Sequence, residues 1–381
     1  MKSYDIVVVG LGAVGSAALY QLSKRGVQVL GIDQYDPPHT FGSSHGETRI
    51  TRVAVGESKD YVKLVARSHE LWREIEEKSG DTLFTNCKGI LMDSGRGPWS
   101  KYGSEGFLEK TIALAREFHI PHEVLFQKEL RDQFPQFQLE SSWKAYLEKG
   151  AGFLRPELCI STQLELAKNY GAEVMLNTAV QSLDSSLEEG IILQLENESI
   201  FAKRVLLSAG GWLKDFLPKQ EKSDYKICRQ VLHWVKITEN HAAWQDSPVY
   251  MWGFGPNPED FIYGFPSLDG ESVKMASESF LSTDHPELLN REVTSQEQRQ
   301  FIAEKIKGRF SGLSNEILKS SVCFYTVTSD ARFVIKPLTN HPKALMISAC
   351  SGHGFKHSAA LGEYLAEKLL GIKPKVEMGL I

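Results

Sequence analysis

Three glycines and one aspartate near the start of the chain have the spacing of a dinucleotide-binding turn. Gly10, Gly12 and Gly15 follow the pattern G-x-G-x-x-G, and Asp33 lies further along. Gly10 would permit a tight turn, Gly12 would let the backbone approach a pyrophosphate, and Gly15 would let a helix pack against a sheet. Asp33 can accept hydrogen bonds from a ribose diol, and an acid there argues against NADP. The spacing predicts a dinucleotide site; the alternative is a buried turn without a ligand.

Two other segments concentrate groups that could hold an anion. Segment 42–52 contains Arg49 and Arg52, and the turn 352–356 ends in Lys356. Because the two arginines are three residues apart, both would face the same way on a helical turn. A helix start beside Lys356 would suit a delocalised anion, such as the N1–C2=O edge of a reduced flavin. The alternative for either segment is a solvated turn with structural arginines, but a neighbouring nucleotide site favours binding.

The elements that must position these residues follow from the apolar pattern. A β-branched run at 5–9 predicts a strand, a helical stretch reaches Gly26, and a second apolar run at 27–30 precedes Asp33. The N-terminus of this helix would offer unpaired N–H groups to phosphates. The strand–helix–strand context supports a nucleotide site, but it does not distinguish NAD from FAD.

The rest of the chain alternates between two kinds of organisation. Helical spacing from Asp60 to Ser79 predicts a helix with Asp60 as its N-cap. The regular alternation of strands and helices is lost between about 86 and 145, and the pattern from about 218 to 320 is strand-rich. Elsewhere we expect strands at 172–177, 202–208, 231–237, 261–265, 272–276 and 344–350, and helices at 157–170 and 355–370. This order fits a cofactor domain that a second domain interrupts twice.

Composition restricts the classes of function. The 381 residues are enough for two domains with separate cores. A net charge of −5 without a strong basic run argues against a nucleic-acid partner. No apolar stretch approaches the roughly 20 residues of a membrane span, and no signal-peptide pattern precedes the first strand, so we expect a cytoplasmic protein without membrane contact. The five widely spaced cysteines form neither a complete disulfide framework nor a Cys-x-x-Cys metal site, and we expect no metal.

Several further motifs belong to one recognisable pattern. They lie in segments 10–33, 36–40, 44–52, Tyr263-Gly264-Phe265-Pro266, Cys323-Phe324-Tyr325-Thr326 and Ser351-Gly352-His353-Gly354-Phe355-Lys356. Together these motifs resemble the monomeric sarcosine oxidase and N-methyltryptophan oxidase family of FAD-containing amine oxidases. The resemblance covers nearly the whole chain and implies an α/β fold. The implied fold consists of a glutathione-reductase-type FAD-binding Rossmann domain and a second mixed, strand-rich substrate domain. The implied boundaries are 1–85, 148–217 and 322–381 for the FAD-binding domain, and 86–147 and 218–321 for the substrate domain.

The resemblance implies FAD as a covalently attached cofactor. Cys323 matches the cysteine whose sulfur is bonded to the flavin 8α-methyl carbon. A thiolate attacking the quinone-methide tautomer of the flavin would form this bond, and nearby positive charge should favour it. The other four cysteines are expected to be small buried hydrophobes. The expected cofactor-binding residues are Gly10, Gly12, Gly15, Asp33, Ser43, His45, Thr48, Arg49, Val180, Cys323, Gly352, Gly354 and Lys356.

Catalytic roles also come from the resemblance. Arg49 and His45 match residues packed against the flavin ring, where a fixed cation would make the flavin easier to reduce. Lys274 matches a lysine near the place where oxygen reacts, and a cation there would stabilise developing superoxide. The alternative for Lys274 is an exposed strand lysine. We expect Lys274, Arg49, His45 and Tyr325 to be the catalytic residues.

The same resemblance implies a substrate site. Arg52 and Lys356 match the pair that holds the substrate carboxylate, with a bidentate fork and a point charge. Tyr263 and Tyr325 match aromatic residues beside the substrate amine. Glu278 departs from the family, which carries a histidine there. This carboxylate would favour a cationic group on the substrate, pair with Arg52, or face solvent. We therefore expect a larger or more basic N-alkyl amino acid, or a cyclic secondary amine, rather than sarcosine.

The implied activity is oxidation of the C–N bond of a secondary amino acid, either N-methylated or cyclic. The imine product is hydrolysed to an aldehyde and an amine, and oxygen is reduced to hydrogen peroxide. The expected partners are the amino acid and oxygen, and the family name implies a monomer. The nearest alternative is an FAD-dependent amino acid dehydrogenase with another acceptor. An NAD-dependent dehydrogenase would leave Cys323 unexplained, and a non-enzymatic FAD-binding protein would not need Arg49, Arg52 and Lys356.

Overall fold

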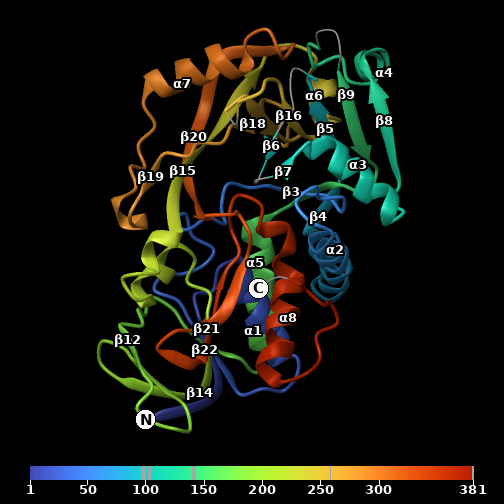
Figure 1. Cartoon of the computed structure of the whole chain (residues 1–381). Coiled ribbons are helices and arrows are strands. Elements are labelled where there is room, and N and C mark those ends of the chain that lie inside the picture. Colours follow the sequence, from blue (N-terminus) through green and yellow to red (C-terminus); the bar gives the residue numbers. More distant parts are fainter. Residues whose placement is uncertain (96–99, 102–103, 140–142, 258, 380–381) are drawn as a thin grey trace.

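Two large sheets organise the molecule, and the chain crosses between them several times (Figure 1). The computed structural model describes residues 1–95, 100–101, 104–139, 143–257 and 259–379. The first sheet carries the nucleotide-binding turn, and the second is the strand-rich part predicted from the sequence. The chain therefore has a mixed α/β fold with several sheets, as expected.

The first sheet has eight strands, and α1 packs against α5 and α8 beside it (Figure 1). Its strands are β11 (Glu173–Met175), β2 (Val29–Ile32), β1 (Lys2–Val9), β14 (Ser199–Leu207), β13 (Ile191–Gln194) and β12 (Ser182–Asp184), with β22 (His341–Ser348) beside β14 and β21 (Val334–Leu338) beside β22. β1, β2, β11, β14 and β22 are parallel. Their nearly continuous apolar residues are typical of strands covered on both faces.

The register of the parallel strands brings their carboxyl ends to one level. Val9 lies opposite Ile32 on one side and Leu207 on the other, and Leu207 lies opposite Met346. Met175 of β11 lies opposite Ile32. The segments that follow these strands therefore meet along one edge of the sheet, the edge at which ligands bind in open α/β folds.

The predicted helices are present, with one correction. Their bounds are α1 (Ala13–Ser23), α2 (Lys59–Ser79), α5 (Pro156–Asn169) and α8 (Ser358–Leu370). Asp60 as an N-cap is wrong, because Ser58 occupies that position and its hydroxyl accepts a hydrogen bond from the Asp60 N–H at 3.3 Å. Serine is an equally good cap, and Asp60 instead places a negative charge in the first turn.

The second sheet has nine strands and is almost entirely antiparallel. Its strands are β19 (Ser282–Thr283), β15 (Tyr225–Ile237), β18 (Ser272–Ala276), β17 (Phe261–Gly264), β16 (Val249–Gly253), β5 (Gly89–Asp93), β9 (Lys144–Glu148) and β8 (His122–Phe126), with β20 (Leu313–Thr328) beside β15. β5 and β16 form the parallel pair. The predicted boundary at residue 322 falls inside β20, which pairs with β15 up to Thr328. The division into domains otherwise stays a prediction.

A small three-stranded sheet lies between the two large sheets and includes part of segment 42–52. It consists of β3 (Arg49–Thr51), β10 (Gly152–Leu154) and β4 (Phe84–Asn86). The remaining elements are β6 (Ser100–Lys101), β7 (Ser104–Glu105), α3 (Phe107–Glu117), α4 (Gln127–Gln133), α6 (His241–Gln245), α7 (Ser295–Phe301) and the short helical turns Gly210–Phe216, Lys222–Asp224, Pro286–Leu288, Ile302–Ile306 and Phe355–His357. The last of these turns leads directly into α8.

Candidate active site

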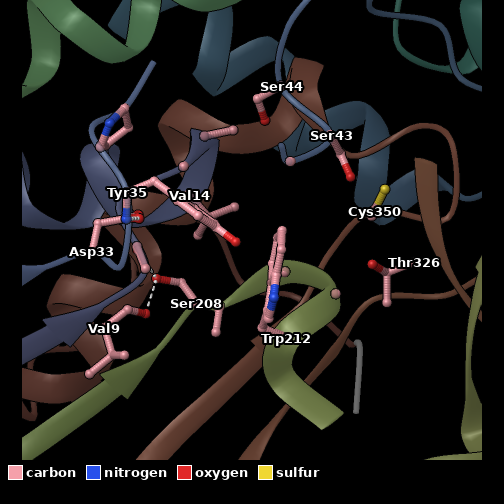
Figure 2. Close-up of a pocket in the computed structure, with 18 of the residues that line it drawn as sticks. Val9, Val14, Asp33, Tyr35, Ser43, Ser44, Ser208, Trp212, Thr326 and Cys350 are labelled. Atoms are coloured by element: carbon pink, nitrogen blue, oxygen red, sulfur yellow. Dashed lines mark hydrogen bonds between the residues drawn. The ribbon is translucent and has the colours of Figure 1, made fainter. Parts of the chain in front are cut away.

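The first cavity lies at the carboxyl edge of the first sheet. Its lining includes the predicted cofactor residues Gly10, Gly12, Asp33, Ser43, Arg49, Val180, Gly352 and Gly354. Figure 2 shows Asp33 and Tyr35 on one side, Thr326 and Cys350 on the other, and Trp212 between them. Asp33 and Tyr35 follow β2, Trp212 follows β14 and Cys350 follows β22, whereas Thr326 lies within β20 of the second sheet. Both sheets therefore contribute to the wall of this cavity.

The glycine turn has the geometry that a pyrophosphate requires. Gly10 has a φ of +87°, which side-chain-bearing residues rarely adopt. A Cβ on Gly15 would lie 1.8 Å from the carbonyl oxygen of Gly10, so helix and strand could not pack this closely with any other residue. A Cβ on Gly12 would meet no atom within 4 Å, which leaves its backbone open to the cavity. Helix α1 has no side-chain cap, so its first N–H groups can bind phosphate. The residues present therefore fit a dinucleotide.

Asp33 ties the glycine turn to the end of β2. Its Oδ2 accepts a hydrogen bond from the N–H of Leu11 at 2.7 Å, and its Oδ1 accepts one from the N–H of Tyr35 at 2.9 Å. Burial raises the pKa of Asp33, while these two hydrogen bonds oppose that shift. Each carboxylate oxygen has a further lone pair, so Asp33 can still accept hydrogen bonds from a ribose.

A second cavity adjoins the first. Its lining includes Thr48, Arg49, Arg52, Tyr263, Lys274, Glu278, Cys323, Tyr325, Gly352 and Lys356. Arg49, Tyr325 and Gly352 line both cavities, so one end of a ligand in the first cavity can border the second. The structure therefore brings all the predicted substrate-binding residues and most of the predicted catalytic ones into one place.

Two carboxylates that were not predicted as site residues hold segment 42–54 in place. Glu157 of α5 accepts hydrogen bonds from the N–H of Gly46 and of the residue after it, at 2.5 and 3.1 Å. Glu148 at the end of β9 accepts hydrogen bonds from the N–H of Val53 and of the residue after it, at 2.6 and 3.0 Å. No local pattern marked these acids, because each acts on a segment remote in the sequence.

The prediction that a helical turn aligns Arg49 with Arg52 is wrong, because Arg49 to Thr51 form the extended strand β3. Arg49 donates hydrogen bonds to the carbonyl oxygens of Thr48 at 2.8 Å and of Ser43 at 2.7 Å. Arg52 lies just beyond the strand and donates to the carbonyl oxygen of Ala54. Both arginines still line the second cavity, because the chain turns after β3.

An ionised glutamate lies between the two predicted carboxylate-binding cations. Glu57 Oε2 is 3.7 Å from Arg52 Nη2, and its Oε1 is 3.6 Å from Lys356 Nζ. Burial opposes ionisation of Glu57, but Lys356 and Arg52 outweigh it and lower its pKa to about 2. Two cations and one anion leave a single positive charge, which matches one substrate carboxylate. Glu57 could not be singled out from the sequence, because no spacing distinguishes it from nearby acids.

Lys356 lies at the second cavity, and its predicted contact with the N1–C2=O edge of a flavin stays a prediction. Its side chain is buried, and its Nζ donates a hydrogen bond to the carbonyl oxygen of His353 at 2.9 Å. Lys356 lines the second cavity and is absent from the lining of the first. The glycines of the same turn, Gly352 and Gly354, do line the first cavity.

Lys274 is buried, not exposed, which rules out the alternative of an exposed strand lysine. The Nζ of Lys274 donates to the carbonyl oxygen of Gly46, and to the carbonyl and hydroxyl oxygens of Thr48, both at 2.9 Å. These three acceptors match the three N–H bonds of an ammonium group. Burial, and then the charge of Arg49, nevertheless lower the pKa of Lys274 well below its usual value.

Cys323 lines the second cavity beside the tyrosines. Burial raises the pKa of the Cys323 thiol, and the nearby charges of Arg49 and Lys274 oppose that shift. The hydroxyl groups of Tyr263 and Tyr325 are 3.5 Å apart. Burial also raises the pKa of Tyr263, so its phenol stays protonated near neutral pH. The charges of Arg49 and Lys274 thus favour the thiolate of Cys323, but burial outweighs them and holds its pKa above the usual value.

His45 is buried, but it is absent from the linings of both cavities. Burial, and then the charges of Arg49 and Lys274, lower its pKa to about 3, so the imidazole is neutral. His45 thus lies near Arg49 and Lys274 without lining either cavity. Its contact with a flavin stays a prediction.

The fold and the two joined cavities define a dinucleotide-dependent oxidoreductase. A family model described as "FAD dependent oxidoreductase" (DAO) matches residues 5–368, and the chain belongs to this family. It is 32% identical over 380 residues to monomeric sarcosine oxidase of Bacillus sp. strain B-0618, covering 99% of this chain and 95% of that protein. It is 30% identical over 370 residues to N-methyl-L-tryptophan oxidase of Yersinia pestis, covering 95% and 94%.

A solved structure has the same fold. NikD, an unusual amino acid oxidase essential for nikkomycin biosynthesis, matches in its open form with a TM-score of 0.82 and 19% identity, covering 100% of this chain and 96% of that chain. The sequence motifs predicted this family correctly, and the NAD-dependent alternative is excluded because the family depends on FAD.

Proposed function

We propose that the protein oxidises the C–N bond of a secondary amino acid, either N-methylated or cyclic, with oxygen as the acceptor. The arrangement of Arg52 and Lys356 around Glu57 carries this proposal, because its net charge suits one carboxylate at the wall of a flavin-binding cavity. The names of the similar proteins, sarcosine oxidase and N-methyltryptophan oxidase, support the same substrate class. The products would be an imine, hydrolysed to an aldehyde and an amine, and hydrogen peroxide.

The side chains of this cavity would bind and orient the substrate. FAD, when bound, would supply the chemistry by accepting two electrons, as a hydride equivalent from the carbon atom of the C–N bond, and passing them to oxygen. Arg52 and Lys356 would hold the carboxylate, while Tyr263 and Tyr325 would flank the amine. The buried surroundings favour the neutral amine, so no strong base is needed to remove a proton from its nitrogen.

The first test of this function compares substrates under air. Peroxide release would be measured with sarcosine, N-methyltryptophan, proline and pipecolate, together with the spectrum of the purified protein. We expect flavin absorbance and peroxide formation with at least one of these amino acids. Substrate-dependent bleaching of the flavin under air without peroxide would instead support the FAD-dependent dehydrogenase.

Covalent attachment of FAD through Cys323 is part of the proposal. We expect flavin to stay with the acid-precipitated wild-type protein and to enter the supernatant from Cys323→Ser, because serine cannot form the thioether. Cys350→Ser is the matched control, since Cys350 lines the first cavity. Flavin that remains in the pellet of Cys323→Ser but leaves Cys350→Ser would assign the bond to Cys350.

Glu278 is proposed to select substrates with a second polar or cationic group. It lines the second cavity, where burial raises the pKa of the neighbouring Tyr263 and the charge of Glu278 adds to that shift. We expect Glu278→Gln to reduce the preference for a basic over an apolar N-alkyl substrate by about tenfold, corresponding to about 1.4 kcal/mol of lost electrostatic complementarity. The ratio of kcat/KM values would measure this preference, with the exposed Glu239→Gln as control. A clear preference of the wild type for sarcosine would contradict the proposed selectivity.

We also propose that the protein is a monomer and that it is located in the cytoplasm. The name of monomeric sarcosine oxidase supports the monomer, and light scattering would test it. None of the helices in the described part of the chain combines the length and apolar character of a membrane span.

A further inference from the structure

A third cavity, which we call the vestibule, lies on the other side of Lys274. It has a volume of about 230 Å³, and its lining includes Thr48, Trp234, Phe265, Leu268, Lys274 and Leu318. Thr48, Phe265 and Lys274 also line the second cavity, so they form a partition between the two spaces. Leu268 and Leu318 are 50% and 45% exposed, which places the outer end of the vestibule at the protein surface.

A β-bulge shapes the wall of the vestibule. Trp234 pairs with Lys319, but Val235 pairs with Ile317, so Leu318 is an extra residue in β20. Neighbouring residues of a regular strand point to opposite faces, yet Leu318 and Lys319 both line the vestibule. Bulges redirect side chains in this way and are frequent next to active sites. The bulge therefore places an apolar side chain at the mouth of the vestibule.

The charges at the mouth are already paired. Glu47 accepts hydrogen bonds from Lys319 Nζ and from Trp234 Nε1, both at 3.0 Å. Asp269 accepts hydrogen bonds from the side chain and the backbone N–H of Ser272, at 2.7 and 2.8 Å. Since Glu47 is paired with Lys319 and Asp269 is already hydrogen-bonded to Ser272, these carboxylates are poorly placed to bind a further ion. The aromatic and aliphatic walls of the vestibule instead suit a small uncharged molecule.

We propose that the vestibule is the entry route and transient binding site of molecular oxygen, separate from the cavity that holds the amino acid. This inference rests on the proposed oxidase function. Oxygen would reach the partition formed by Lys274 and Phe265 without passing the substrate carboxylate site. It would there take up two electrons and two protons, both supplied through the reduced cofactor, and leave as hydrogen peroxide. A ligand in the second cavity would then not block the approach of oxygen.

Xenon is a direct probe of this route, because it binds small apolar cavities. Crystals of the FAD-containing protein under xenon pressure should show an anomalous peak between Trp234, Phe265 and Leu318. Leu318→Trp should remove this peak by filling the vestibule. Absence of xenon from the wild-type vestibule would overturn the inference, whatever the activity of the enzyme.

Kinetics test the same variant in solution. We expect Leu318→Trp to slow oxidation of the reduced flavin by oxygen at least fivefold, and to change anaerobic reduction by substrate less than twofold. Leu288→Trp is the control, because Leu288 is 68% exposed and outside all three cavity linings. If Leu318→Trp and Leu268→Trp both reoxidised their reduced flavin at the wild-type rate, the proposed entry route would be overturned. The proposed oxidase function would not be affected by that result. If the reduced wild-type enzyme did not react with oxygen, the proposed acceptor would fail, and the route with it.

Discussion

Lys274→Met is expected to slow the reaction of the reduced enzyme with oxygen by about 10²–10³-fold, the usual effect of removing one preorganised electrostatic group. Lys274 is the cationic member of the buried partition between the second cavity and the vestibule, and its Nζ is oriented by Gly46 and Thr48. Methionine keeps much of the volume but removes the positive charge and all three donors. Stopped-flow mixing of the reduced enzyme with oxygen would measure the effect.

The reductive half-reaction separates this role from general damage to the site. Anaerobic reduction by substrate should change less than threefold in Lys274→Met, because the carboxylate-binding cations Arg52 and Lys356 remain. Lys236→Met is a suitable control, since this lysine pairs with Glu316 at the surface of the second sheet. Equal slowing of both half-reactions would remove the assignment of Lys274 to oxygen.

The lowered pKa of Lys274 gives the oxygen reaction a pH dependence with a definite sign. Lysine is charged below its pKa and neutral above it, and burial and Arg49 shift this pKa well below the usual value. If the charged form assists oxygen, the rate should fall as pH rises through the lowered pKa, at a lower pH than an ordinary lysine would give. Lys274→Met should lack this titration. A pH-independent wild-type rate would contradict a role for the charge.

Arg52→Met is expected to reduce kcat/KM for amino acid substrates by about 30–5,000-fold, because truncating one member of a buried charge pair costs about 2–5 kcal/mol. Arg52 is 5% exposed and lies 3.7 Å from Glu57. Its loss would remove the bidentate donor for the substrate carboxylate. It would also cancel the net positive charge, since Lys356 alone balances Glu57. Steady-state kinetics with the best amino acid substrate would measure the effect.

Substrate analogues and a conservative variant identify the lost interaction. A secondary amine without a carboxylate should react with Arg52→Met and the wild type at rates within about threefold. Arg52→Lys should recover part of the loss, because lysine restores the charge but not the planar fork. Equal losses for amines with and without a carboxylate would show that Arg52 supports the fold of the site rather than binding the substrate.

The nucleotide-binding unit could be predicted because its determinants are local. The apolar run before Gly10 forms β1, and the spacing to Gly15 determines how α1 returns against the strand. The φ of Gly10 and the absence of space for a Cβ on Gly15 are consequences of that short segment. Three strands of the second sheet, β15, β17 and β18, were predicted for the same reason, since their pattern is a property of adjacent residues. The other six strands of this sheet were not predicted.

The arrangement of the candidate site could be predicted only in part. Motifs placed Arg52, Lys356 and Cys323 in one family pattern, and the structure brings them around one cavity. No pattern in the sequence indicated that Glu57 lies between the two cations. It also left open whether Lys274 is buried, because the residues that cover it belong to distant segments. The orientation of Arg49 and Arg52 was wrongly derived from a helix where the chain forms a strand.

The sequence by itself determined the cofactor class, the family and the residue types available for chemistry, because short motifs and local backbone conformation encode them. Only the tertiary structure decided which charges meet. The register of the parallel strands brings together segments that line the first cavity. Glu148 and Glu157 hold segment 42–54 beside the second cavity, and the bulge at Leu318 shapes the vestibule. Charge pairing and burial depend on distances in space, and residues far apart in the chain set those distances only when the sheets pack together.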